Sequence, residues 1–404
     1  MTEKKNWRTP AVVVACAGLA MTIVLGTRHG FGLYLQPMTL DLGLSRETFS
    51  FAIALQNLFY GFSQPLTGMI TDKFGPARVM AAGTIAYAIG LVLMSHATTG
   101  MELNWSAGLL IGLALGCCGF STVYGVVGRV VPAKNRSTAM GIVGAAGSMG
   151  QFLMLPYGQL LINHLGWQQA LLILAVTVLL LLPLSAALVE DKQAQAQALF
   201  KQSISAALHE AFTHRGFVLM CIAYTVCGFQ LLFISVHFPA YLIDQKMTPA
   251  TGMIALALIG LFNTFGSYTW GWLGSRHTKK YLLATLYFTR AMVVMAFILA
   301  PLSPMTVYLF SAAIGFLWLG TAPITSALIA QIFGVRYLST LSGCAFMFHQ
   351  CGSFLGVWLG GRIFDATGSY TLMWWITIVA GFVAALLSLP VDEREIPRIA
   401  SAAA

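Results

Sequence analysis

The chain has 404 residues, of which 58% are hydrophobic and only 9% are charged, and its mean hydropathy is +0.79. Soluble domains carry about 25% charged residues, so the composition excludes an ordinary soluble protein and indicates an integral membrane protein. The net charge of +9 does not indicate nucleic-acid binding, because most basic residues fall between apolar runs, where they set membrane orientation. The sequence has no GxxxxGK[ST], HExxH or CxxC motif, so we expect no ATP-driven transport, enzymatic activity, cofactor or metal.

Twelve apolar segments are each long enough to span a bilayer, which takes about 20 residues. They cover residues 10–38, 46–71, 77–97, 103–131, 136–164, 167–189, 214–243, 249–275, 280–300, 303–333, 338–364 and 370–390. The first is too long for a signal-peptide core, so we expect it to stay as an anchor. The sequence therefore predicts an all-α fold with twelve transmembrane helices in two six-helix halves, residues 1–189 and 214–404. The polar residues 190–213 join them as a cytoplasmic linker, with an amphipathic surface helix along 199–212.

Basic residues mark one set of loops between the segments. That set includes Lys4, Lys5, Arg8, Lys73, Arg78, Lys134, Arg136, Lys192, Lys201, Arg215, Arg276, Lys279, Lys280, Arg336, Arg394 and Arg398, whereas the opposite loops hold Arg46 and Lys246. The basic side of a membrane protein is the cytoplasmic side, so we expect both termini in the cytoplasm.

The two halves repeat one pattern at an offset of 202 or 203 residues. Gly68 and Asp72 correspond to Gly271 and Ser275, and the Ser137–Thr138 pair corresponds to Ser339–Thr340. A repeat of six helices in the same orientation is typical of a transporter with a site between two parallel halves.

The stretch from Gly68 to Arg78 resembles the signature of the major facilitator superfamily between helices 2 and 3, with Asp72, Lys73 and Gly75 in place. The stretches 31–38, 44–47, 74–78 and 161–167 are similar to bacterial monocarboxylate and oxalate–formate porters. The chain departs from that group in helix 8, where residues 260–267 contain no Arg, and Ser275 replaces the second signature Asp. The resemblance implies a monomeric multi-pass carrier in a bacterial inner membrane.

The signature implies a conformational latch formed by Gly68, Asp72, Lys73, Gly75 and Arg78. The glycines permit a turn and close helix contact, Asp72 can accept hydrogen bonds from a neighbouring helix N-terminus, and the basic side chains can pair with carboxylates. The alternative is an ordinary basic loop that only sets orientation.

Buried charge gives the main indication of function. All thirteen acidic residues lie in loops or near helix ends, whereas Arg28 and Arg290 lie near mid-span and Arg129 lies near the end of helix 4. An Arg deep in an apolar segment costs several kcal/mol and calls for an anion, which a substrate carboxylate can supply through bidentate bonds. Arg28 is the first candidate for binding the substrate anion. For Arg290, a role in helix packing is an equal alternative. The side chain of Arg129 can extend to the cytoplasmic membrane interface.

Polar and aromatic side chains complete the predicted substrate site. It comprises Arg28, Asn57, Tyr60, Tyr124, Gln151, His237, Asn263, Arg290, Trp318 and His349. His29, His237 and His349 are the candidates for proton coupling, because His titrates near neutral pH and no acid lies at mid-span. Each has a structural alternative, namely a hydrogen bond or packing contact between helices.

We therefore expect a secondary transporter of a small organic anion, a mono- or dicarboxylate, that works by alternating access and can be proton-coupled. The alternatives are an effluxer of drugs or sugars and a receptor that uses a carrier fold without transport. An effluxer of cationic drugs is expected to have a buried carboxylate, which the sequence does not provide.

Overall fold

The computed structural model describes residues 8–44, 46–189 and 203–396. Residues 190–202 of the predicted linker lie outside this described part, and so does the start of its predicted amphipathic helix. The remainder of that helix is α11 (Ile204–Thr213), which begins after a Ser203 cap.

The N-terminal half contains the helices that precede the linker. They are α1 (Pro10–Gly30), η1 (Phe31–Tyr34), α2 (Leu35–Leu42), α3 (Arg46–Phe74), α4 (Pro76–Ser95), α5 (Gly100–Leu103), η2 (Asn104–Leu110), α6 (Ile111–Cys118), α7 (Phe120–Val130), η3 (Ala133–Asn135), α8 (Arg136–Leu179) and α9 (Leu181–Ala187). The C-terminal half contains α12 (Arg215–Asp244), α13 (Pro249–Gly274), α14 (Lys279–Leu299), α15 (Pro304–Phe316), α16 (Thr321–Phe333), α17 (Leu338–Thr367) and α18 (Thr371–Ser388).

The described helices account for the twelve predicted crossings. Eight stretches are long and apolar enough to cross a membrane by length and composition, and the stretch 133–187 holds two crossings separated at Gly166. Gly166 has φ 79°, so the chain turns there, although its hydrogen bonding continues. The long helices α3, α13 and α17 supply the other three crossings.

Three predicted segments are interrupted rather than straight. The first changes at Gly30 into the 3₁₀ turn Phe31–Tyr34, and the fourth breaks at Gly119, which has extended backbone. The tenth consists of α15 and α16, which are separated by residues 317–320. Such breaks expose backbone polar groups inside a bilayer, where they need partners within the protein.

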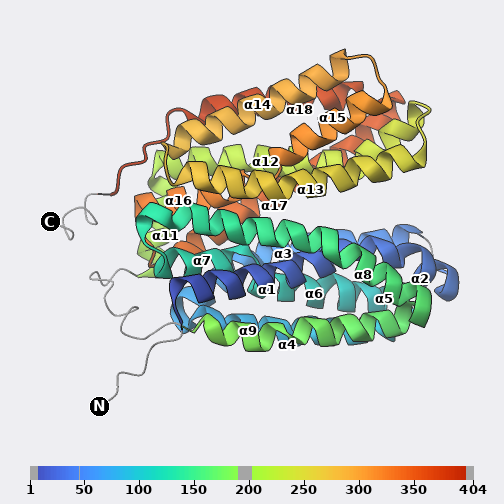
Figure 1. The fold of residues 1–404 in the computed structure, drawn as a ribbon, viewed down its shortest axis with the longest axis horizontal. Helices are drawn as coiled ribbons and strands as arrows, with labels where there is room; N and C mark the ends of the chain where they lie inside the picture. The colour runs from blue at the N-terminus through green and yellow to red at the C-terminus, as the bar shows by residue number, and fades with distance from the viewer. Residues whose placement is uncertain (1–7, 45, 190–202, 397–404) are drawn as a thin grey trace.

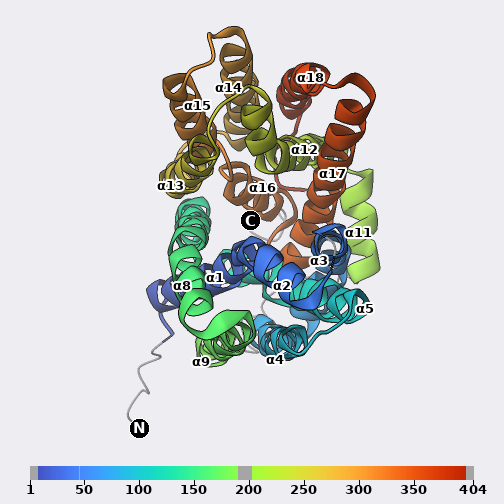
Figure 2. The same ribbon diagram turned by 90° about the vertical axis from the view of Figure 1, so that its right-hand side faces the viewer.

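The two halves lie against each other along two seams (Figures 1 and 2). One seam joins α8 to α13, and the other joins α3 to α17. At the first, the Cβ of an alanine at Gly141 would lie 2.8 Å from the Cα of Gly271. At the second, a Cβ at Gly68 would lie 2.5 Å from the backbone oxygen of Ser339. Glycine therefore permits both close crossings.

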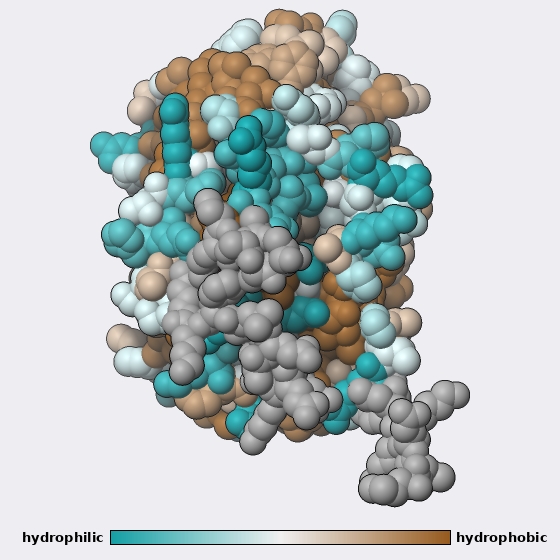
Figure 3. Space-filling model, turned by 90° about the vertical axis from the view of Figure 1, so that its left-hand side faces the viewer, coloured by the Kyte–Doolittle hydropathy of each residue, from teal (hydrophilic) through white to brown (hydrophobic). Residues whose placement is uncertain are grey.

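Both of these crossings lie toward the end of the bundle at which α1 begins and α18 ends. We call it the basic end, because the described helix ends and loops there carry Lys73, Arg78, Lys134, Arg136, Arg276, Lys279, Lys280 and Arg336. It is the left-hand end in Figure 1, and Figure 3 shows hydrophilic side chains gathered across it. The contacts at the seams close the basic end between the halves.

Candidate functional site

Arg28 lies in the last turn of α1, next to the point where the first crossing changes to 3₁₀ geometry. Its guanidinium donates a hydrogen bond to Oδ1 of Asn57 on α3 and lies 5.0 Å from the ring centroid of Tyr60. A Cβ at Gly30, two residues after Arg28, would meet nothing within 4 Å, so there is open space at that position. Arg28 is partly exposed, and in the described part of the chain no carboxylate pairs with it.

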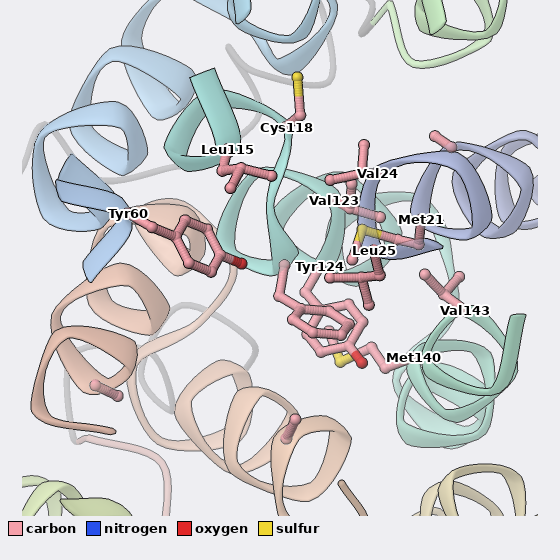
Figure 4. Close-up of a cluster of buried hydrophobic side chains, with 14 of the residues drawn as sticks. Met21, Val24, Leu25, Tyr60, Leu115, Cys118, Val123, Tyr124, Met140 and Val143 are labelled. Atoms are coloured by element: carbon pink, nitrogen blue, oxygen red, sulfur yellow. The ribbon is translucent and has the colours of Figure 1, made fainter. Parts of the chain in front are cut away.

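Tyr60, which lies against Arg28, belongs with Tyr124 to one cluster of buried apolar side chains. Figure 4 shows them projecting from α3 and α7, with Met21 and Leu25 of α1 nearby. Both tyrosines are about 1% exposed, and within the described part of the chain the hydroxyl of Tyr124 has no hydrogen-bond partner. An unpartnered hydroxyl in an apolar wall can bond to a ligand that reaches it.

The C-terminal half faces Arg28 through α17. Nε2 of Gln350 donates to the backbone oxygen of Asn57 at 3.4 Å, and Nδ1 of His349 lies 3.2 Å from Oε1 of Gln350. The ring of Phe346 packs on Tyr60, with 5.2 Å between centroids. Asn57 therefore contacts Arg28 through its side chain and the opposite half through its backbone.

Arg290 is fully buried, unlike Arg28, and it bonds to the protein itself. Its guanidinium donates to the backbone oxygens of Leu317 and Trp318 and, at 3.3 Å, to Oε1 of Gln230 and Sγ of Cys227. The two carbonyls belong to the break between α15 and α16. Arg290 thus supplies donors to a helix end that would otherwise be unsatisfied in the membrane.

Asn263 and Trp318 hold helices together near the seam between α8 and α13. Nδ2 of Asn263 donates to Oγ of Ser148 at 2.9 Å, and its Oδ1 accepts the backbone N–H of Leu319 at 3.1 Å. Trp318 is partly buried and contributes its backbone oxygen to Arg290. Gln151 on α8 is also partly buried, one turn beyond Ser148.

The three candidate histidines have different surroundings. His29 is exposed, with Nδ1 2.8 Å from the backbone oxygen of Leu25. His237 has a partner on each ring nitrogen, the hydroxyl of Tyr370 at 3.1 Å and the backbone oxygen of Val357 at 2.9 Å. His349 is 5% exposed and belongs to the group around Asn57.

The signature residues meet the opposite half at the basic end. Oδ2 of Asp72 accepts from both the backbone N–H and the hydroxyl of Thr340 at 2.7 Å, while Oδ1 accepts from Ser339 N–H at 3.3 Å. Arg129 pairs with the same carboxylate at 2.9 Å. The expectation that Asp72 accepts bonds at a helix N-terminus agrees with this geometry.

The other signature residues have separate positions. Gly75 has φ 89° and precedes α4, Lys73 lies beside the Phe74 ring, and Arg78 is exposed. Sequence reasoning did not assign Arg129 to Asp72 and grouped it with cations that lack a carboxylate. The Arg129–Asp72 pair corrects that interpretation.

A family model of the Major Facilitator Superfamily matches residues 11–322 and 246–404. The chain belongs to this superfamily. It is 25% identical over 380 residues to the uncharacterized MFS-type transporter YcxA of Bacillus subtilis (strain 168), with 90% of each chain covered. It is 26% identical over 378 residues to monocarboxylate transporter 13 of Bos taurus, which covers 92% of this chain and 85% of that protein.

Solved structures of the superfamily share the fold. The E. coli fucose:proton symporter FucP superposes with a TM-score of 0.73 at 18% identity, covering 95% of this chain and 98% of that chain. The proton:xylose symporter XylE gives a TM-score of 0.73 at 15% identity, covering 97% and 98%.

Membership confirms several predictions made from the sequence. The protein is an all-α, multi-pass membrane protein of the superfamily fold, it is a secondary transporter rather than an enzyme, and its distant relatives include proteins named monocarboxylate transporters. The superfamily transports small molecules, so a small-molecule substrate is implied.

Proposed function

We propose that this transporter carries a small organic anion, a mono- or dicarboxylate, and that Arg28 is its anchor. The observation that supports this most directly is the environment of Arg28. It is a partly exposed guanidinium inside a spanning segment, with an amide oxygen as its hydrogen-bond partner and no paired carboxylate among the described residues. A neutral amide oxygen leaves the charge uncompensated, and an incoming carboxylate can replace it with a bidentate, charge-assisted contact.

The surroundings of Arg28 fit a small substrate. Tyr60 and the Phe346 ring packed on it form apolar walls, with Tyr124 in the same apolar cluster as Tyr60. Asn57 and His349 provide a few polar groups, which is the usual make-up of a small-molecule site. Both terminal nitrogens of the Arg290 guanidinium bond to protein groups, so we assign Arg290 a structural role in this closed arrangement and place the substrate at Arg28.

We also propose that the transport is coupled to protons through His349. It is buried and touches Gln350, which bonds to Asn57, so its charge would act on the substrate site. His237 is less suited, because both of its ring nitrogens already have partners, and His29 points to an exposed position. The carboxyl group of the substrate could carry the proton without any of them.

The proposed orientation places the basic end in the cytoplasm of a bacterial cell, with both termini inside. The contacts at the seams then close the cytoplasmic side, and Arg28 faces the opposite compartment. Reporter fusions after Pro132 and after Lys246, which lie at opposite ends of the bundle, should report opposite sides of the membrane.

The test is uptake by purified protein in liposomes. Labelled lactate, formate, oxalate, an aromatic acid and a dicarboxylate are offered to the unaltered chain, to Arg28→Ala and to the control Arg394→Ala, whose side chain is 90% exposed at the basic end. We expect saturable uptake of at least one acid, its loss in Arg28→Ala and its retention in the control. Uptake that survives Arg28→Ala, or uptake of neutral sugars alone, would support the effluxer alternative. The complete absence of flux, with ligand binding retained, would support the receptor alternative.

A further inference from the structure

The basic end has a charged contact at one seam and a neutral one at the other. At the α3–α17 seam, Asp72 accepts the backbone N–H of Thr340 at 2.7 Å. At the α8–α13 seam the repeat places Ser275 opposite Thr138, and Ser275 Oγ accepts from the N–H and the hydroxyl of Thr138, both at 2.9 Å. The geometry is repeated, but the carboxylate is missing.

The partner of that carboxylate is missing as well. The 202-residue offset that relates Ser137 to Ser339 relates Arg129, which pairs with Asp72, to Gln331 on α16. Gln331 has different neighbours from Arg129. Its Nε2 donates to the backbone oxygen of Glu393 at 2.9 Å, and its Oε1 accepts from Nζ of Lys279 at 2.7 Å. The position therefore holds the segment that follows α18.

This segment, Val391–Ile396, is fixed against the helices of the C-terminal half. Val391 is 1% exposed and Ile396 is 8% exposed, and the N–H of Ile396 donates to the backbone oxygen of Ile332 at 3.2 Å. The carboxylate of Glu393 accepts the backbone N–H of Lys280 in the first turn of α14. In the described structure, the N-cap residue of that helix, Thr278, makes no side-chain capping bond of its own. Glu393 thus acts as the cap of α14.

Glu395 extends the same segment to the N-terminal half. It lines a pocket of about 310 Å³ together with Glu393 and with Arg136 and Ser137, the first two residues of α8. Glu395 is exposed, and it shares this pocket with the guanidinium of Arg136, whose buried Nε has no hydrogen-bond partner among the described residues. A carboxylate is stabilised near a helix N-terminus by the helix dipole, and it is stabilised near a guanidinium by the opposite charge.

We propose that Val391–Ile396 is a second latch, which supplies at the α8–α13 seam the negative charge that Ser275 lacks. Gln331 and the α14 N-terminus hold the segment on the C-terminal half, and Glu395 places its charge in the pocket that Arg136 lines from the N-terminal half. Moving the halves apart at the basic end separates Glu395 from Arg136, so the latch favours the closed arrangement. The inference needs only the rocking of two halves and is independent of the substrate.

Hydrogen exchange of the whole protein in detergent or nanodiscs tests it. The variant is Glu395→Gln, and the matched control is Asp392→Asn, whose carboxylate pairs with Arg394 on the exposed part of the same segment. We expect roughly fivefold faster exchange in the first turn of α8, around Thr138. We expect the same factor around Thr340, whose hydrogen bonds in the described structure go to Asp72 and not to the segment, because opening the basic end releases both seams together.

The remote site separates a latch from a local structural contact. Faster exchange near α8 and α14 alone, faster exchange throughout both bundles, no change at all, or an equal change in Asp392→Asn would each overturn the proposal. The paired variant Arg136→Glu with Glu395→Arg reverses both charges and should restore the exchange of the unaltered chain at both seams. This result would also exclude misfolding as the cause of the effect in Glu395→Gln.

Discussion

Replacing Arg28 by Lys or Ala separates the charge of the proposed anchor from its geometry. Arg28 bonds to Asn57 and offers its other N–H groups to a ligand in two parallel bonds, whereas Lys keeps the charge and loses the planar fork. A hydrogen bond to a charged group contributes about 1.5–3 kcal/mol. Losing one such bond in Arg28→Lys should weaken binding by roughly tenfold to a hundredfold, and Arg28→Ala should weaken it by more than about a hundredfold.

The assay is thermal stabilisation by ligand, because specific binding to the folded state raises apparent stability with ligand concentration. Each variant is titrated with lactate, formate, oxalate, aromatic acids and dicarboxylates, and with neutral sugars as controls. We expect at least one acid to stabilise the unaltered chain, with affinity falling in the order Arg, Lys, Ala. Equal affinities in all three proteins, or stabilisation by sugars alone, would refute the assignment of Arg28 as an anion anchor.

Three further outcomes are expected from other parts of the structure. Gly228→Ala should destabilise the protein by about 1–3 kcal/mol, visible as a lower melting temperature, because the new Cβ would lie 1.8 Å from the backbone oxygen of His349; an unchanged melting temperature would contradict this packing. Asp72→Asn should accelerate hydrogen exchange around Thr340, since an amide cannot replace the carboxylate that accepts from this residue and from Arg129; protection equal to the unaltered chain would argue against a latch. His349→Gln should remove acceleration of uptake by an inward proton gradient and leave exchange transport without a gradient, and a retained gradient response would exclude His349 from proton coupling.

The sequence was most informative where a pattern is local or repeated. Apolar length predicted the crossings, and the spacing from Gly68 to Asp72 predicted a contact at a helix N-terminus, which the Asp72–Thr340 hydrogen bonds agree with. The interruptions of helices were not predicted. Gly166 turns the chain while the helical hydrogen bonding continues. The break between α15 and α16 is stabilised by Arg290, which lies 27 residues before Leu317, whose carbonyl it binds.

The spacing of residues in the sequence could not predict which distant side chains or carbonyls bind the buried arginines. Arg28, Arg129 and Arg290 look alike in sequence, since each is a cation in an apolar segment. The fold gives them different partners, namely an amide oxygen, a carboxylate and helix-end carbonyls. Tertiary contacts alone decide which of the three is left for a ligand.

The energetics of these three arginines also bear on how the transporter can move. Arg129 is neutralised by Asp72 within the N-terminal half, and it also donates to the backbone oxygen of Val335 in the other half at 3.4 Å, so this second contact favours one arrangement of the halves. Arg290 bonds within one half and can keep its partners during rocking. Arg28 bonds to Asn57 in its own half, and Asn57 in turn contacts Gln350 of the other half. A substrate carboxylate that replaces the Asn57 amide at Arg28 would therefore act on a residue that bridges the halves. Binding at one arginine can then bias the closure that Asp72 and the segment 391–396 hold at the basic end, since a ligand shifts such an equilibrium by its difference in affinity for the two arrangements.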